Sequence, residues 1–193
     1  MNRLERLKTQ VSSPLPDNTK AADRYYQYQG YREHYDDPVP IARAWAENAL
    51  CRLHEIYIYE DDVVLGSLRS IASSDPTITD ALLNKASAIV DSYGSHWFWM
   101  NYDHYAPDYE TFLRLGVQGT LDRIESSAAE HADDPKKARF LEACRISMQG
   151  FSDMLGRYAA AAKEKADSVK GEAQHRFLEL SRICRSLAVS PPA

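Results

Sequence analysis

The side chains best suited to chemistry gather between positions 96 and 105. This short stretch holds groups that hydrogen-bond, stack or titrate: His96, Trp97, Trp99, Tyr102, Asp103, His104 and Tyr105. A histidine exchanges a proton near neutral pH, so His96 and His104 are candidates for acid–base work. Asp103 could orient an imidazole, and the two tryptophans could exclude water. The stretch therefore predicts one wall of a binding pocket.

A purely structural interpretation stays open beside this one. Two histidines in an aromatic loop can serve as hydrogen-bonded packing groups with no ligand. His96 and His104 are eight positions apart and do not form an H-E-x-x-H pattern or another spacing typical of metal ligands. No metal site is expected.

Composition limits the classes of protein. The 193 residues suit one domain, with 44% hydrophobic and 26% charged residues and a net charge of −5. The charges are mixed in sign along the chain, which disfavours nucleic-acid binding. No apolar run is long enough for a membrane span, and the charged start from Met1 to Lys8 lacks the apolar region of a signal peptide. We expect a cytoplasmic protein.

The cysteines indicate no redox or metal chemistry. Cys51, Cys144 and Cys184 are odd in number and form no C-x-x-C pair. We expect them to be reduced and mostly buried thiols in a reducing compartment.

Periodicity predicts a mainly helical chain with one β-hairpin, forming a single helical domain over 1–193. The hairpin is expected at 55–66, where Glu55-Ile56-Tyr57-Ile58-Tyr59 alternates with period two and an acidic turn precedes Val63-Val64-Leu65-Gly66. The predicted helical segments are 2–10, from Asp17 or Asn18 to the run Asp36-Asp37-Pro38-Val39-Pro40 that ends it, 41–53, from Asp75 to Tyr93-Gly94, from Pro107 through Ile124, and from the connection at 131–135 to Leu187.

The order of several short motifs resembles the N-terminal region of glycyl-radical enzymes of the pyruvate formate-lyase type, in the branch of dehydratases and lyases. The motifs span about 150 residues. They are Arg43-Ala44-Trp45-Ala46, Leu65-Gly66, Asp103-His104-Tyr105-Ala106-Pro107-Asp108-Tyr109, Phe112-Leu113-Arg114-Leu115-Gly116-Val117-Gln118-Gly119, Phe140-Leu141-Glu142-Ala143, Arg157-Tyr158-Ala159 with Ala162, Arg176 with Glu179-Leu180 and Cys184, and Pro191-Pro192.

The resemblance implies the helical part of an α/β barrel whose active site lies inside the barrel. It implies a glycyl radical, installed by an S-adenosylmethionine radical activase, and a cysteine that becomes a thiyl radical. This sequence departs from that pattern: it has no Gly-Cys-x-Glu loop and no Arg-Val-Ser/Ala-Gly-Tyr loop, and none of its cysteines follows a glycine. We therefore expect no catalytic residue, and no bound cofactor, on this chain alone.

By the same resemblance, His104 matches a family position that commonly contacts substrate or moves a proton. His96, Trp99, Tyr102 and Asp103 complete the expected substrate-binding set. The implied function is radical elimination or C–C cleavage of a small polar substrate by a complete, anaerobic and dimeric enzyme. Its partners would be the remainder of the barrel and the activase.

A second hypothesis assigns the chain a binding function instead of a part in catalysis. The chain would be a stand-alone, non-catalytic helical domain of the same ancestry, which binds a protein partner or a small ligand. The sequence after Ala193 in the source gene distinguishes the two hypotheses.

Overall fold

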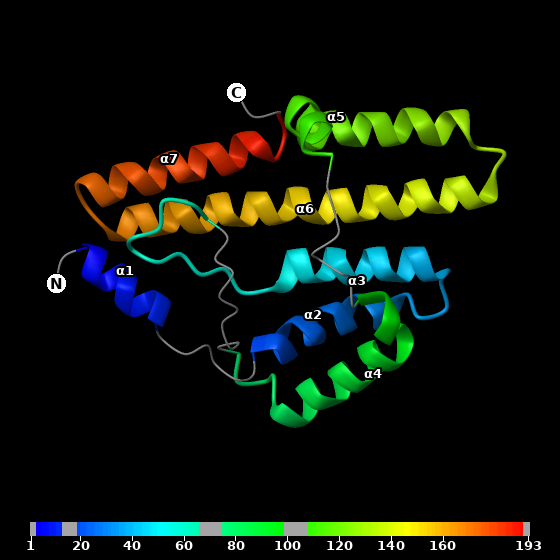
Figure 1. The fold of residues 1–193 in the computed structure, drawn as a ribbon, viewed down its shortest axis with the longest axis horizontal. Helices are drawn as coiled ribbons and strands as arrows, with labels where there is room; N and C mark the ends of the chain where they lie inside the picture. The colour runs from blue at the N-terminus through cyan, green and yellow to red at the C-terminus, as the bar shows by residue number, and fades with distance from the viewer. Residues whose placement is uncertain (1–2, 13–18, 66–74, 99–107, 191–193) are drawn as a thin grey trace.

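The computed structural model describes residues 3–12, 19–65, 75–98 and 108–190. Its helices are α1 (Arg3–Ser12), α2 (Thr19–Glu33), α3 (Val39–Leu53), α4 (Asp80–Phe98), α5 (Tyr109–Glu130), α6 (Pro135–Ser168) and α7 (Glu172–Leu187). Figure 1 shows the longest helix, α6, through the middle of the molecule. Helices α5 and α7 lie along one side of α6, and α3 lies along the other. Helix α2 packs on α3, and α4 packs on α2.

Local sequence explains where the last three helices begin. Asp108 caps α5 by accepting a hydrogen bond from the Thr111 amide at 3.0 Å. Asp134 caps α6 by accepting from Lys136 and Lys137, and Pro135 follows it as the first helical residue. The predicted connection at 131–135 is confirmed. The predicted continuous helix to Leu187 is wrong, because the chain breaks after Ser168 and reverses at Gly171, which has φ 67°.

Small residues allow the central helices to approach closely. Ala42 and Ala46 of α3 are fully buried in a cluster with Tyr31 of α2 and Val90 of α4. A Cβ on Gly30 would collide with the carbonyl of Trp45, so α2 crosses α3 with its backbone in contact. Helix α3 is thereby held between α2 and α6, and its residues face both neighbours.

The predicted β-hairpin is wrong, since the described residues between 54 and 65 contain no strand. The turn itself forms: the Asp62 amide donates to the Tyr59 carbonyl at 3.2 Å, and the Tyr59 amide donates to Asp62 Oδ2 at 2.8 Å. The two arms do not pair with each other within the described residues. Arg157 of α6 and Arg176 of α7 bind backbone carbonyls before the first arm and at the turn. The apolar residues Ile58 and Leu65 instead pack on a cluster formed by α6 and α7.

Helix α4 differs from its prediction at both ends. Asp75 forms a separate turn, in which its side chain accepts from the amide and hydroxyl of Thr77, and the helix begins at Asp80. It continues past the predicted stop at Tyr93-Gly94 to Phe98. The helix therefore runs into the aromatic stretch and includes His96.

Candidate functional site

The predicted substrate-binding residues lie at and beyond the end of α4. His96 belongs to the last turn of this helix. Trp99, Tyr102, Asp103 and His104 fall outside the described residues. The role of all five residues therefore stays a prediction.

The helix that follows this stretch has an unusual backbone. Gly116 interrupts α5 with φ 65° and ψ −168°, a combination that residues with a Cβ rarely adopt. The Thr120 hydroxyl donates to the Gly116 carbonyl at 2.7 Å. This bond gives the carbonyl at the interruption a hydrogen-bond partner. The first two turns of α5, with their Asp108 cap, therefore point in a direction of their own. They set where the chain emerges from the 99–107 stretch.

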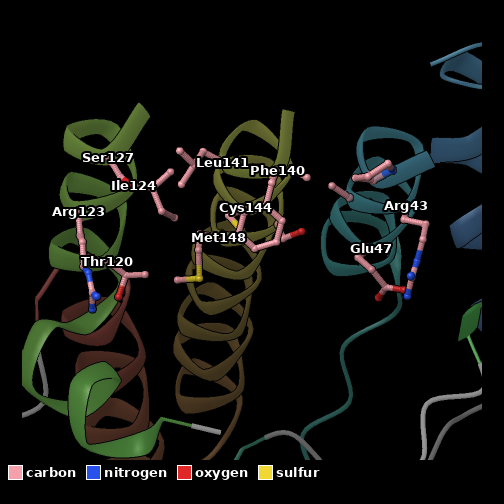
Figure 2. Close-up of a pocket in the computed structure, with 14 residues that line it drawn as sticks. Arg43, Glu47, Thr120, Arg123, Ile124, Ser127, Phe140, Leu141, Cys144 and Met148 are labelled. Carbon is pink, nitrogen blue, oxygen red and sulfur yellow. The ribbon is translucent and has the colours of Figure 1, made fainter. Parts of the chain in front are cut away.

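A groove of about 700 Å³ lies on the face formed by α3, α5 and α6. Figure 2 shows α6 between the other two helices, with Phe140, Leu141, Cys144 and Met148 along it. Ile124 and Ser127 enter from α5. Phe140 is 63% exposed and lines the groove with its apolar ring. The groove is thus an apolar surface that the described chain leaves open.

Charged groups stand on both walls of the groove. Arg43 and Glu47 lie on α3, and Arg123 lies on α5. Gln27 of α2, itself buried, donates to Glu47 Oε1 at 3.1 Å. Burial raises the pKa of Glu47, which the hydrogen bond from Gln27 and the charges of Arg43 and Arg24 partly oppose. The groove can therefore take an apolar group between walls that carry charges of both signs.

A second polar region joins the end of α3 to α6. Arg157 of α6 donates to the carbonyl of Cys51 at 2.7 Å and to the carbonyl of His54. These bonds cap the last turn of α3, whose final carbonyls have no partner within the helix. The region anchors the chain as it leaves α3, and it forms no catalytic arrangement with the nearby thiol.

The thiols are poor nucleophiles. Burial raises the pKa of Cys51 to about 11, and the neighbouring Glu47 carboxylate adds to this. Burial also raises the pKa values of Cys144 and Cys184. All three cysteines are free, and they are buried or half-buried. Only Cys184 is buried, whereas Cys51 and Cys144 are half-buried, and their reduced state stays a prediction.

Metal clusters and membrane-spanning helices are both absent from the residues for which the structure gives positions. No three His, Cys, Asp or Glu side chains among them come together as a metal site would require. None of the helices in those ranges combines the length and apolarity that crossing a membrane demands.

The comparison with family models identifies the class of protein. The model described as pyruvate formate lyase-like matches residues 73–193, which is more than half of the chain. The chain belongs to the pyruvate formate lyase-like family, and the resemblance found in its motifs is confirmed. No curated protein matches the sequence.

Solved structures of glycyl radical enzymes share the fold. The glycyl radical enzyme from Archaeoglobus fulgidus aligns with 99% of this chain and 32% of its own, with a TM-score of 0.74 and 17% identity. The glycerol-bound, B12-independent glycerol dehydratase from Clostridium butyricum aligns with 93% of this chain and 32% of its own, with a TM-score of 0.67 and 16% identity.

A third similar structure concerns 1,2-propanediol dehydration in Roseburia inulinivorans. It aligns with 88% of this chain and 27% of its own, with a TM-score of 0.70 and 19% identity. The chain thus spans about a third of the length of these enzymes.

Sequence reasoning missed the residues of the groove. Those on α3 and α5 are far apart in the chain and carry no shared motif. The motif Phe140-Leu141-Glu142-Ala143 indicated only a family resemblance, although Phe140 and Leu141 both line the groove. No local pattern in the sequence points to the groove, because three separate helices form it.

Proposed function

We propose that this chain is the N-terminal helical part of a glycyl-radical dehydratase or lyase, inactive by itself. The observation that carries the proposal is the pattern of alignment: nearly all of this chain matches about a third of each glycyl radical enzyme. The sequence carries neither the cysteine loop nor the glycyl-radical loop on which the chemistry of such enzymes depends. Radical elimination or C–C cleavage would therefore need further polypeptide.

The proposed contribution of this chain is one wall of the substrate pocket, formed by residues 96–105. His104 would hold or deliver a proton to a small polar substrate, and Asp103 would orient its imidazole. His96, Trp99 and Tyr102 would shape the pocket. Supporting this, the helices on both sides of the stretch are anchored: α4 packs on α2, and α5 packs on α6.

The remaining parts of the proposal follow from the family. The radical would be held by the remainder of the barrel and installed by an S-adenosylmethionine activase. The complete enzyme would be a cytoplasmic dimer, and residues 1–193 would act as one helical domain of it.

Sequencing the source gene past the codon for Ala193 tests this proposal directly. A frame that continues into a Gly-Cys-x-Glu loop and a glycyl-radical loop would support it. Turnover by the purified 193-residue chain, with any activase, would contradict it.

In a complete enzyme, the role of His104 can be measured separately. His104→Ala should lower turnover by at least about tenfold, as expected for loss of an acid–base group. His175→Ala is the matched control, because His175 is exposed on α7. If His104→Ala and His175→Ala turn over substrate at the same rate, His104 is a packing residue.

A stand-alone ligand-binding domain is the second candidate, and the open groove beside Phe140 is the observation that favours it. A stop codon directly after Ala193 would exclude radical catalysis on this chain. It would leave binding, by the groove or by the aromatic stretch, as the function to examine.

A further inference from the structure

The groove between α3, α5 and α6 has one apolar end and one polar end. Figure 2 shows Phe140 and Leu141 toward the first end, and the nitrogen atoms of Arg123 and Arg43 toward the other. Phe140 and Met148 both line the groove from α6. With a rise of 1.5 Å per helical residue, they are separated by about 12 Å along the helix. The groove therefore suits an elongated molecule whose two ends differ in polarity.

Three hydrogen-bond donors that line the groove have no partner among the residues that the structure describes. They are the Arg123 guanidinium and the hydroxyls of Ser127 and Ser147. A helical serine can donate to a carbonyl one turn earlier, as Ser126 does to Asp122 at 3.0 Å. The two groove serines do not, so their hydroxyls remain available. An apolar lining with a few polar groups, in a volume of about 700 Å³, is typical of small-molecule sites.

The charges that line the groove favour an anion. On the α3 wall, the opposite charges of Arg43 and Glu47 offset each other, and Gln27 also donates to Glu47 at 3.1 Å. On the α5 wall, Arg123 forms an ion pair with no carboxylate in the described ranges. The lining is therefore net positive, although the chain has a net charge of −5. A guanidinium binds a carboxylate through two parallel hydrogen bonds, so a carboxylate complements Arg123.

We propose that the groove binds an amphipathic monocarboxylate, whose carboxylate pairs with Arg123 and whose apolar body lies along α6 toward Phe140. Leu141 and Met148 contact the apolar body from α6, and Ile124 contacts it from α5. The inference goes beyond the proposed part in radical catalysis. It assigns a ligand class to the groove that favours the second candidate function.

A carboxylate ligand satisfies groups that an apolar protein surface would leave without partners. Covering the groove with such a surface would withdraw the hydroxyls of Ser127 and Ser147 from water and supply no acceptor, which costs free energy. An amphipathic acid covers the apolar end and brings an acceptor to the end where the Arg123 guanidinium lies. The ligand is therefore an acid with one apolar chain rather than a purely apolar partner.

Titration of the 193-residue chain, followed by NMR, tests the site. The probe is decanoate, a soluble carboxylate with a single apolar chain. Decanoate should shift the amide signals of Ile124, Ser127 and Cys144, which line the groove, and leave those of α4 unchanged. Decylammonium has a similar chain and the opposite charge, and it should bind there at least about tenfold more weakly, because like charges repel at Arg123. Equal affinity for the two probes, or no shift at the groove with decanoate, would overturn the proposal.

Two arginine variants on α5 form a matched pair. Arg123→Gln removes the charge from the groove and should weaken decanoate binding by about fivefold. Arg114 is also exposed on α5 but does not line the groove, so Arg114→Gln should bind decanoate as the unmodified chain does. Hydrogen bonds from Thr111 chiefly lower the pKa of Asp108, and both arginines add to this with their charges, so the pair matches in that respect too. Equal affinities of the two variants would overturn the pairing of the carboxylate with Arg123.

A second pair of variants tests the apolar end. Phe140→Ala should weaken decanoate binding at least about threefold, because the ligand then covers less apolar surface. Leu113 is 54% exposed on α5 outside the groove, and Leu113→Ala should leave the affinity unchanged. Both side chains are largely exposed, so neither substitution should unfold the protein. Equal affinities of these two variants would contradict the placement of the apolar body.

Sedimentation of the chain without ligand covers a competing occupant, a second copy of the chain. We expect a monomer over the concentrations used for NMR. A dimer that Phe140→Ala abolishes and Leu113→Ala retains would assign the groove to a second copy and overturn the proposed ligand. None of these results depends on the gene sequence or on turnover, so the proposed function is tested separately.

Discussion

Asn48 of α3 and Gly150 of α6 are in contact where the two helices cross. The Asn48 side chain is 4% exposed, and its Nδ2 donates to the Ile146 carbonyl at 2.8 Å. A Cβ on Gly150 would lie 2.7 Å from Asn48 Cα, closer than real Cβ atoms approach. The buried amide can reach the backbone of α6 only because position 150 has no side chain.

Gly150→Ala should therefore destabilise the protein. We expect the free energy of unfolding to fall by about 1–3 kcal/mol, since the added methyl group must push two packed backbones apart. Gly156→Ala is the control on the same helix, because a Cβ there would meet nothing within 4 Å. It should raise stability by up to about 1 kcal/mol, through helix propensity alone. Urea unfolding measures both, and similar effects of the two substitutions would contradict the tight crossing.

Arg157→Ala should loosen the chain after α3. The half-buried guanidinium donates to the carbonyls of Cys51 and His54, and its loss leaves these acceptors without a protein donor. We expect a loss of about 1–3 kcal/mol in the free energy of unfolding and faster amide exchange near residue 54. Arg182→Ala removes an exposed arginine that pairs with Glu179 on the same helix, and it should change neither quantity. Unchanged exchange near residue 54 in Arg157→Ala would argue against the anchoring role.

Glu47→Gln should alter the dependence of stability on pH. Burial raises the pKa of Glu47 in the folded state above its ordinary value of 4.5. The folded state then binds the proton more tightly than the unfolded state, so stability falls as pH rises from 4.5 through the folded pKa. Glutamine keeps an acceptor for Gln27 and carries no charge. The variant should gain stability relative to the unmodified protein as the pH rises above 4.5. A difference independent of pH in urea unfolding would refute this.

Cys51 should alkylate slowly in the folded protein. A pKa of about 11, against an ordinary value of 9.0, lowers the thiolate fraction near pH 8 by about a hundredfold. Mass spectrometry of iodoacetamide-treated peptides measures its rate, and the urea-unfolded chain supplies the control, in which all three cysteines should react alike. Equal rates at Cys51 in the folded and unfolded chains would contradict the burial of this thiol.

The sequence predicted most helices because their signals are local. Asp134 and Pro135 are typical of the start of a helix, and α6 begins there. The spacing of apolar residues from Ile41 to Leu53 predicts a helix that matches most of α3. The prediction of a hairpin at 55–66 was wrong because strand pairing is not a local property of the sequence. Alternation along Ile56–Ile58 predicts an extended backbone, but it does not identify what the backbone pairs with.

The candidate site was predictable only in part. The order of motifs identified the family, and His96 and His104 were named from the same stretch of sequence. The groove beside Phe140 could not be predicted in this way. Its walls come from α3 and α5, and the sequence of neither helix indicates that the other lies nearby.

The sequence by itself determined most of the helical segments, the connection at 131–135 and the family, since each depends on residues close together in the chain or on their order along it. The tertiary structure decided the contact of Asn48 with Gly150, the open groove and the lack of a strand pair among the described residues between 54 and 65. The contacts of Arg157 and Arg176 with the backbone between Cys51 and Asp62 join residues 103 to 116 positions apart. No local pattern specifies such contacts, because they exist only once packing of the helices has set the distances between their surfaces.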